Sequence, residues 1–132
     1  MWRLITIHLW LKNRSDNKMK KITKEQLIHP MVLNLGYKQF TIVQKSLEKD
    51  SLYGCVELPK ALITIDPNQN VPDYKGTLLH EILHVGWDLF GLGDDDEMPS
   101  MGNEYLTTTS SNVLQLLAGL NPELFEYIFK NG

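Results

Sequence analysis

The apolar positions between residues 77 and 90 recur at helical spacing. They form two adjoining rows in which one residue follows another after three or four positions: Leu78, Ile82, Val85 and Leu89, and Leu79, Leu83 and Phe90. The polar residues form one stripe: Thr77, His80, His84 and Asp88, with Glu81 beside it. Because the stretch is otherwise apolar nearly all round, it predicts a helix buried in a domain core, which begins near Pro72 and ends at Gly91.

Three segments upstream of this helix have the composition of β-strands. They span residues 37–43, 53–58 and 61–65. In the first, Phe40 and Ile42 share one face, and Pro59 and Pro67 punctuate the other two. Since short connections favour antiparallel neighbours, we expect an α+β fold, in which a small antiparallel sheet of about three strands packs on the helix.

Two glycines interrupt these elements. Gly54 lies inside the second predicted strand, where it indicates a bulge or the close approach of another segment. Gly86 lies inside the helix, where glycine is less favourable than alanine by about 1 kcal/mol. We therefore expect a neighbouring element to pack closely against the helix backbone at Gly86.

Two further helices are predicted after a loop that ends near residue 103. The first begins at Glu104 and carries these apolar residues: Leu106, Val113, Leu114, Leu116, Leu117 and Leu120. Asn121 and Pro122 then end this helix and begin the next, with Asn121 as the N-cap and Pro122 in the first helical position. The last helix is apolar at Leu124, Phe125, Ile128 and Phe129.

The first eighteen residues differ from residues 19–132, which are expected to form a single domain. Residues 2–11 are strongly apolar, but no small-residue cleavage site follows them, so a secretory signal is rejected. The alternation of Ile5, Ile7, Leu9 and Leu11 is typical of a strand added to the sheet. Alternatively, translation starts at Met19, whose surroundings resemble an ordinary bacterial start. We favour this second interpretation, in which residues 1–18 are an extension that is loosely packed or disordered.

Length and composition set the class of the protein. The chain has 132 residues, of which 42% are apolar and 22% charged, as in an ordinary globular domain with one core. The net charge of −3 gives no indication of nucleic-acid binding, and no apolar run is long enough to span a bilayer. The single cysteine, Cys55, excludes an internal disulfide and fits a reducing compartment. We expect Cys55 to be a small buried apolar residue.

The polar stripe contains the motif His-Glu-x-x-His, formed by His80, Glu81 and His84. Residues four apart lie on the same face of a helix, so both imidazoles can reach one metal ion. Neutral imidazole suits zinc, and a catalytic zinc site has three protein ligands and an open position for water. Glu81 is rotated by about a quarter of a turn from His80, where it can accept a proton from a zinc-activated water.

The alternative is a pair of core histidines that are hydrogen-bonded to their neighbours, with Glu81 paired to a lysine. Burying two imidazoles and a carboxylate on a leucine-rich helix is costly unless partners satisfy them. The helical context therefore favours a metal.

A third ligand must come from outside the motif. No histidine follows His84, and His8 and His29 lie in upstream segments that are not expected to reach the site. Asp88 lies one turn further along the stripe, where it would orient a histidine and not bind the metal.

Glu104 is the favoured third ligand. It opens the next helix, which can fold back antiparallel after a loop of about a dozen residues. A carboxylate in the first turn of a helix is also stabilised by the helix dipole, and the two roles are compatible. We expect a site of two histidines and Glu104 with water in the fourth position, and Asp96 and Glu97 are the next candidates.

At this point the chain resembles a known group of proteins. The motif, the strand ending Ile63-Thr64-Ile65-Asp66, and the helix from Glu104 to Asn121-Pro122-Glu123-Leu124-Phe125 are similar to the small phage and prophage metallopeptidase-like proteins. These proteins are similar in plan to minimal gluzincins (minigluzincins) and to the ImmA/IrrE group of zinc peptidases. The resemblance spans roughly residues 35–130 and rests mainly on the His-Glu motif.

The resemblance implies a zincin-like fold, zinc bound by His80, His84 and Glu104, and Glu81 as the general base. Gluzincins often place an aspartate four residues beyond the ligand glutamate, whereas this chain has Thr108 there. The chain therefore departs from the family in the groups that surround the ligands.

Three functions remain. The first, which we favour, is a zinc metalloendopeptidase encoded by a phage or prophage. It would act in the cytoplasm of the bacterial host on a peptide or a protein such as a repressor, without binding nucleic acid or membranes. The second is a non-catalytic phage accessory or interaction protein that zinc stabilises. The third is a metal-free helical interaction domain, which would show no bound metal and no response to a chelator.

Overall fold

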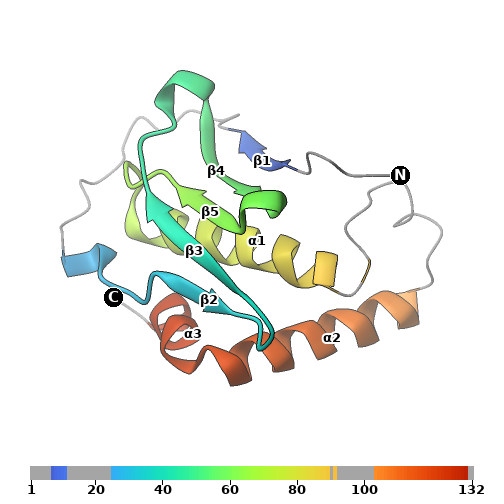
Figure 1. Cartoon of the computed structure of the whole chain (residues 1–132). Coiled ribbons are helices and arrows are strands. Elements are labelled where there is room, and N and C mark those ends of the chain that lie inside the picture. The colour runs from blue at the N-terminus through green and yellow to red at the C-terminus, as the bar shows by residue number, and fades with distance from the viewer. Residues whose placement is uncertain (1–6, 12–24, 90, 92–102, 131–132) are drawn as a thin grey trace.

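The computed structural model describes residues 7–11, 25–89, 91 and 103–130, and in these residues five strands precede three helices (Figure 1). The strands are β1 (Ile7–Leu11), β2 (Val32–Asn34), β3 (Gln39–Gln44), β4 (Leu52–Glu57) and β5 (Leu62–Ile65). The helices are α1 (Val71–Leu89), α2 (Asn103–Leu120) and α3 (Pro122–Phe129). The three predicted helices are confirmed, and the three predicted strands correspond to β3, β4 and β5.

The strands form one mixed sheet in the order β1-β4-β5-β3-β2. Neighbouring strands are antiparallel except β3 and β5, which run parallel with Ile42 opposite Ile63. The α+β class is therefore confirmed. The expectation of a purely antiparallel sheet of about three strands is wrong, because the sheet is larger and contains a parallel pair.

The parallel pair follows from the position of β4. After β3, the chain passes through a short 3-10 turn at Glu48–Asp50 and does not return beside β3. β4 lies instead on the far side of β5, to which the tight turn at Leu58–Lys60 connects it in antiparallel orientation. The rule that short connections give antiparallel neighbours therefore holds for β4 and β5 but not for β3 and β4.

Of the two edge strands, β2 was not predicted, and β1 was one of the alternatives for the first eighteen residues. β2 has only three residues, which is too short for an alternating pattern to be recognised, and Gly36, with φ of +92°, turns the chain from β2 into β3. β1 pairs antiparallel with β4 at the opposite edge. For Ile7–Leu11 the strand interpretation is thus confirmed, and the expectation of a loosely packed or disordered extension is wrong for these residues.

The core lies between the sheet and the helices. α1 lies behind the sheet in Figure 1, and α2 and α3 run along its lower side. The buried apolar residues of the strands are Leu33, Phe40, Ile42, Val56, Ile63 and Ile65, and those of the helices include Tyr74, Leu78, Ile82, Val85, Val113, Leu117 and Leu124. Phe40 and Ile42 are buried and flanked by exposed residues, so the predicted inward face of β3 is confirmed.

Gly86 marks the contact between α1 and α2. A Cβ atom on Gly86 would overlap Cγ1 of Val113 and would lie 2.9 Å from Cδ1 of Leu117. Because Gly86 has no side chain, the two helices can approach closely, as the sequence predicts. At its end α1 is closed by Gly91, whose φ of +78° and N–H donation to Asp88 are typical of a helix C-cap.

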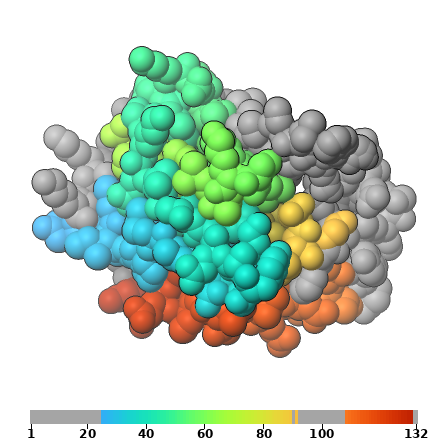
Figure 2. Space-filling model, in the orientation of Figure 1, coloured from blue at the N-terminus to red at the C-terminus, as the bar shows by residue number. Residues whose placement is uncertain are grey.

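Asn121 lies at the N-cap of α3, as predicted, but its side chain does not cap that helix. Its Oδ1 accepts a hydrogen bond from the N–H of Asn34 at 2.7 Å, and its Nδ2 donates to the carbonyl of Asn34 at 2.8 Å. The side chain is therefore used to hold the junction of α2 and α3 against β2. Figure 2 shows the blue segment that contains β2 seated directly above these orange and red helices.

Within the described residues, none of the helices combines the length and the apolar character needed to cross a membrane.

Candidate metal centre

The candidate site lies on α1, whose first turn is held by polar contacts. The N–H of Asp73 donates to Oδ1 of Asn70 at 2.9 Å, which is an N-cap interaction, and Pro72 lies in the first turn as predicted. The helix then buries one continuous face: Tyr74, Thr77, Leu78, Glu81, Ile82, Val85 and Gly86. Glu81 therefore belongs to the buried face of α1, whereas His80 and His84 lie at its border and are half-buried.

The two histidines of the motif are brought together. Their Nε2 atoms are 3.1 Å apart, and the ring planes meet at 76° with their centroids 4.7 Å apart. A tetrahedral zinc ion with bonds of about 2.0–2.1 Å holds two nitrogen ligands about 3.4 Å apart, so this arrangement fits a shared ion closely. The same distance also suits an N–H···N hydrogen bond between two neutral rings. The choice between them depends on Glu81.

Glu81 is a buried acid for which the described residues provide no hydrogen-bond partner. Its side chain is fully buried, and neither carboxylate oxygen has a hydrogen-bond partner among the residues that the structure describes. Burial raises the pKa of Glu81 to about 8. The alternative of a lysine paired with Glu81 finds no support in these residues. A cation held by the adjacent histidines would compensate the cost of burying this carboxylate.

The space around the carboxylate is set by Gly54 of β4. A Cβ atom on Gly54 would lie 3.2 Å from Oε2 of Glu81 and 2.9 Å from Cγ2 of Thr77. Glycine therefore lets α1 pack directly against the backbone of β4. This confirms the predicted close approach at Gly54, and it places Glu81 beneath the strand that is second from the edge of the sheet.

A buried polar network continues from Thr77 toward the end of β5, and sequence analysis did not identify it. The Thr77 hydroxyl lies 2.9 Å from Oε1 of Gln69, and Nε2 of Gln69 donates to the carbonyl of Asp66 at 2.7 Å. Oδ2 of Asp66 in turn accepts the N–H of Leu47. The polar run that follows the third predicted strand was the only signal of it in the sequence. This network fixes α1 against the sheet one turn before Glu81.

His29 is hydrogen-bonded through both nitrogens of its ring. Its Nδ1 donates to the carbonyl of Pro30 at 2.8 Å, and its Nε2 accepts the hydroxyl proton of Tyr74 at 2.7 Å. Both ring nitrogens of His29 therefore have hydrogen-bond partners outside the motif. His8 lies in β1 opposite Val56, and its side chain is outside the described part of the structure.

The described side chains do not provide a third ligand beside His80 and His84. Glu104 lies in the first turn of α2, as predicted, but its side chain is outside the described part, and so are Asp96 and Glu97. Among the described residues, no group of three histidine, cysteine, aspartate or glutamate side chains is placed to hold one ion. Asp88 lies one turn beyond His84 on α1 and is half-buried. Glu104 as a zinc ligand stays a prediction.

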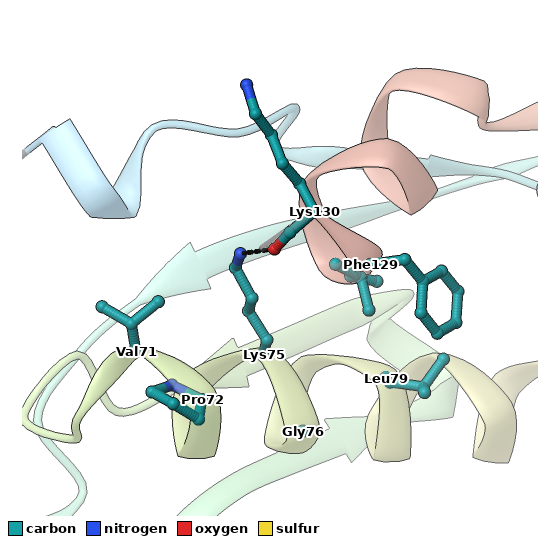
Figure 3. A pocket seen from close by; sticks show the side chains of 8 residues that line it. Val71, Pro72, Lys75, Gly76, Leu79, Phe129 and Lys130 are labelled. Carbon is teal, nitrogen blue, oxygen red and sulfur yellow. Dashed lines mark hydrogen bonds between the residues drawn. The ribbon is translucent and has the colours of Figure 1, made fainter. Parts of the chain in front are cut away.

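A groove of about 400 Å³ lies on another side of α1, where it meets α3 (Figure 3). It is lined by Leu79, Ile128, Phe129 and the residues of the first turns of α1, and Lys75 crosses it to donate a hydrogen bond to the carbonyl of Lys130 at 2.7 Å. None of the three motif residues lines this groove. The groove is therefore separate from the candidate metal centre.

Comparisons with protein-family models, with curated proteins and with solved structures find no match to this chain. The assignment of a function therefore rests on the geometry of α1 and β4 and on the motif.

Proposed function

We propose that this protein is a zinc-dependent metallopeptidase whose centre is formed by His80, Glu81 and His84. One observation carries the proposal: two imidazoles with Nε2 atoms 3.1 Å apart lie next to a fully buried carboxyl group that has no described partner. A metal ion is the simplest single ligand that gives all three groups a role.

Each residue has a distinct task. His80 and His84 would hold the ion, and Glu104 would complete the ligand set from the first turn of α2. Zinc supplies Lewis acidity, which polarises a scissile carbonyl and acidifies water. Glu81 would accept a proton at a carboxylate oxygen from the attacking water and pass it to the departing amine. A base acts best when its pKa lies near the working pH, and burial moves the pKa of Glu81 in that direction.

The resemblance to phage and prophage metallopeptidase-like proteins adds the biological setting. We propose a peptide or a protein, such as a repressor, as the substrate, and the cytoplasm of a bacterial host as the place of action.

A second candidate is a non-catalytic protein in which zinc fastens α1 to α2. Its support is Thr108, which is exposed on α2 at the position where gluzincins often carry an aspartate. In this case zinc would stabilise the fold and no peptide would be cleaved.

Metal content tests the ligand set. We expect about one zinc per chain by elemental mass spectrometry in the tag-free protein, and loss of that zinc in His84→Ala and Glu104→Ala. Glu123→Ala, which removes an exposed first-turn glutamate from α3, is the matched control and should keep the metal. Zinc retained by Glu104→Ala would transfer the third ligand to the acidic loop, and no zinc in the wild type would reject both candidates.

Cleavage separates the two candidates. Zinc-loaded wild-type protein and Glu81→Gln are incubated with a peptide library that is read by mass spectrometry. Under the peptidase proposal the wild type cleaves and Glu81→Gln keeps zinc but loses cleavage by at least about 100-fold. Equal cleavage by both proteins would reject Glu81 as the base, and zinc binding without any cleavage by wild type would favour the accessory protein.

A further inference from the structure

β1 occupies the edge of the sheet next to the candidate metal centre. It runs antiparallel to β4, with Trp10 opposite Gly54 and Leu9 opposite Cys55. Gly54 is the residue whose backbone lies against the carboxylate of Glu81. The backbone of β1 therefore passes one strand spacing, about 4.8 Å, from the backbone that covers Glu81.

Helix geometry places the two histidines on the side of Glu81 that faces β1. Successive residues of a helix are rotated by about 100°, so Leu78, Ile82 and Val85 lie on one side of Glu81 and the histidines lie on the other. The first three belong to the core shared with β5 and β3. Since β5 and β1 flank β4 on opposite sides, His80 and His84 are directed toward the side that β1 occupies.

An extended peptide binds to a sheet most simply as an additional strand at its edge, where main-chain hydrogen bonds hold it. At the edge of β4 such a peptide would bring its own backbone past Glu81 and the histidines. That place is taken by residues of the same chain. We propose that β1 is an internal occupant of the peptide-binding edge of β4, and that an extended segment of a substrate protein must displace β1 before it can be cleaved.

This inference rests on the proposed peptidase function but concerns its regulation and the shape of its substrate. The substrate would be an extended segment, because a helix offers no free main-chain donors and acceptors to the edge of β4. The apparent affinity for substrate would be the intrinsic affinity multiplied by the fraction of molecules in which β1 is undocked.

The native cysteine allows a test in the full chain. Leu9 pairs with Cys55, and directly opposite residues of antiparallel strands have Cα atoms about 4.5–5.5 Å apart, which suits a disulfide. The position of Gly54 faces α1, so the next residue, Cys55, is directed to the opposite face of the sheet. A disulfide in the Leu9→Cys variant would therefore lock β1 without filling the space at Glu81.

We expect oxidised Leu9→Cys to lose at least about 90% of cleavage and to recover it on reduction. The control is Leu9→Cys combined with Cys55→Ser, which cannot form the bond and should not respond to oxidation. Failure of the disulfide to form, or full activity of the locked protein, would overturn the proposal.

A binding measurement is independent of catalysis. In a Glu81→Gln background, a fluorescein-labelled peptide of residues 5–13 is titrated by anisotropy against three proteins: the wild-type strand, the locked strand, and Leu9→Pro with Trp10→Pro. Two consecutive prolines remove one N–H from each side of β1, so at least one lost donor faces β4. We expect at least about tenfold tighter binding to the proline variant and none to the locked protein.

The outcomes separate the two proposals. Equal binding to all three proteins, or equal binding of a scrambled peptide, would reject the role of β1. Displacement of β1 by the peptide without cleavage by any Glu81-intact protein would reject the peptidase function and leave the strand exchange standing. Cleavage that persists when β1 is locked would do the reverse. Circular dichroism of the proline variant checks its fold, and the disulfide variant tests the same point in an intact strand.

Discussion

Gly54 and Glu81 are in direct contact across the interface between β4 and α1. A Cβ atom on Gly54 would lie 3.2 Å from the Glu81 carboxylate and 3.2 Å from the carbonyl of Thr64. The carboxyl group is thus enclosed by backbone on one side and by the helix on the other. This enclosure explains both its complete burial and the raised pKa of Glu81.

Gly54→Ala should destabilise the protein by about 1–3 kcal/mol, because the new methyl group has no room between Thr77 and Glu81. Urea unfolding measures the change. Gly76→Ala is the matched control, since a Cβ on Gly76 meets nothing within 4 Å and alanine is the better helix former. Gly76→Ala should gain up to about 1 kcal/mol, and equal effects of the two substitutions would contradict this account.

Gly86→Ala should also destabilise the protein by about 1–3 kcal/mol, since its methyl group would overlap Val113 of α2. Shortening the partner should relieve the overlap. In a double-mutant cycle with Val113→Ala, we expect the double variant to be more stable than the sum of the single effects predicts by at least about 1 kcal/mol. Additive effects would show that the two helices do not meet at Gly86.

Zinc should raise the melting temperature of the wild-type protein. A ligand at one hundred times its Kd stabilises the state that binds it by about 2.7 kcal/mol. His80→Ala should lose this response, whereas Glu123→Ala should keep it. Thermal unfolding with added zinc and with a chelator measures the effect. An unchanged response in His80→Ala would place the metal away from the motif.

His29 should make stability depend on pH. Burial lowers the pKa of His29 below its usual 6.5, and the neutral ring accepts the proton of Tyr74, whose oxygen accepts one from Gln44. On acidification, His29 of the unfolded chain therefore binds a proton near pH 6.5, whereas His29 of the folded protein binds it only at a lower pH. The stabilisation is complete above pH 6.5 and is lost as the pH falls toward the folded pKa, by at most about 1.4 kcal/mol per pH unit.

Urea unfolding at pH 7.5 and pH 5.5 measures this slope. Comparison with His29→Gln cancels the contributions of all other groups, including Tyr127, whose ring lies 4.8 Å from His29, and Lys75 above that ring. The variant should show the smaller loss of stability on acidification. If both proteins lose the same amount, His29 does not titrate in this range.

Periodicity predicted most of the elements but not their arrangement. The helices and the strands β3 to β5 follow from patterns that local residues carry, and so do the close approaches at Gly54 and Gly86. The parallel pairing of β3 with β5 depends on which side of β5 receives β4, and no local pattern encodes that choice. β2 is too short to show a pattern, and its pairing is decided by tertiary contacts.

The candidate site was likewise predicted from the sequence only in part. Helical spacing is sufficient to bring His80 and His84 together, because both belong to one element. The burial of Glu81 depends on its contact with Gly54 of β4, which the motif does not specify. At Asn121 the sequence predicts the N-cap position, yet the side chain bonds Asn34 instead, since β2 offers it a donor and an acceptor at once.

The contact between Asn121 and Asn34 has a consequence for how copies of this protein behave at high concentration. The last strand of an open sheet presents main-chain groups to which another molecule can add its own edge, and aggregation can begin there. The Asn121 amide fills both hydrogen-bonding groups of Asn34 as a neighbouring strand would. Asn121 thus covers the outward main-chain groups of Asn34, and its loss would leave them open to an edge strand of another molecule.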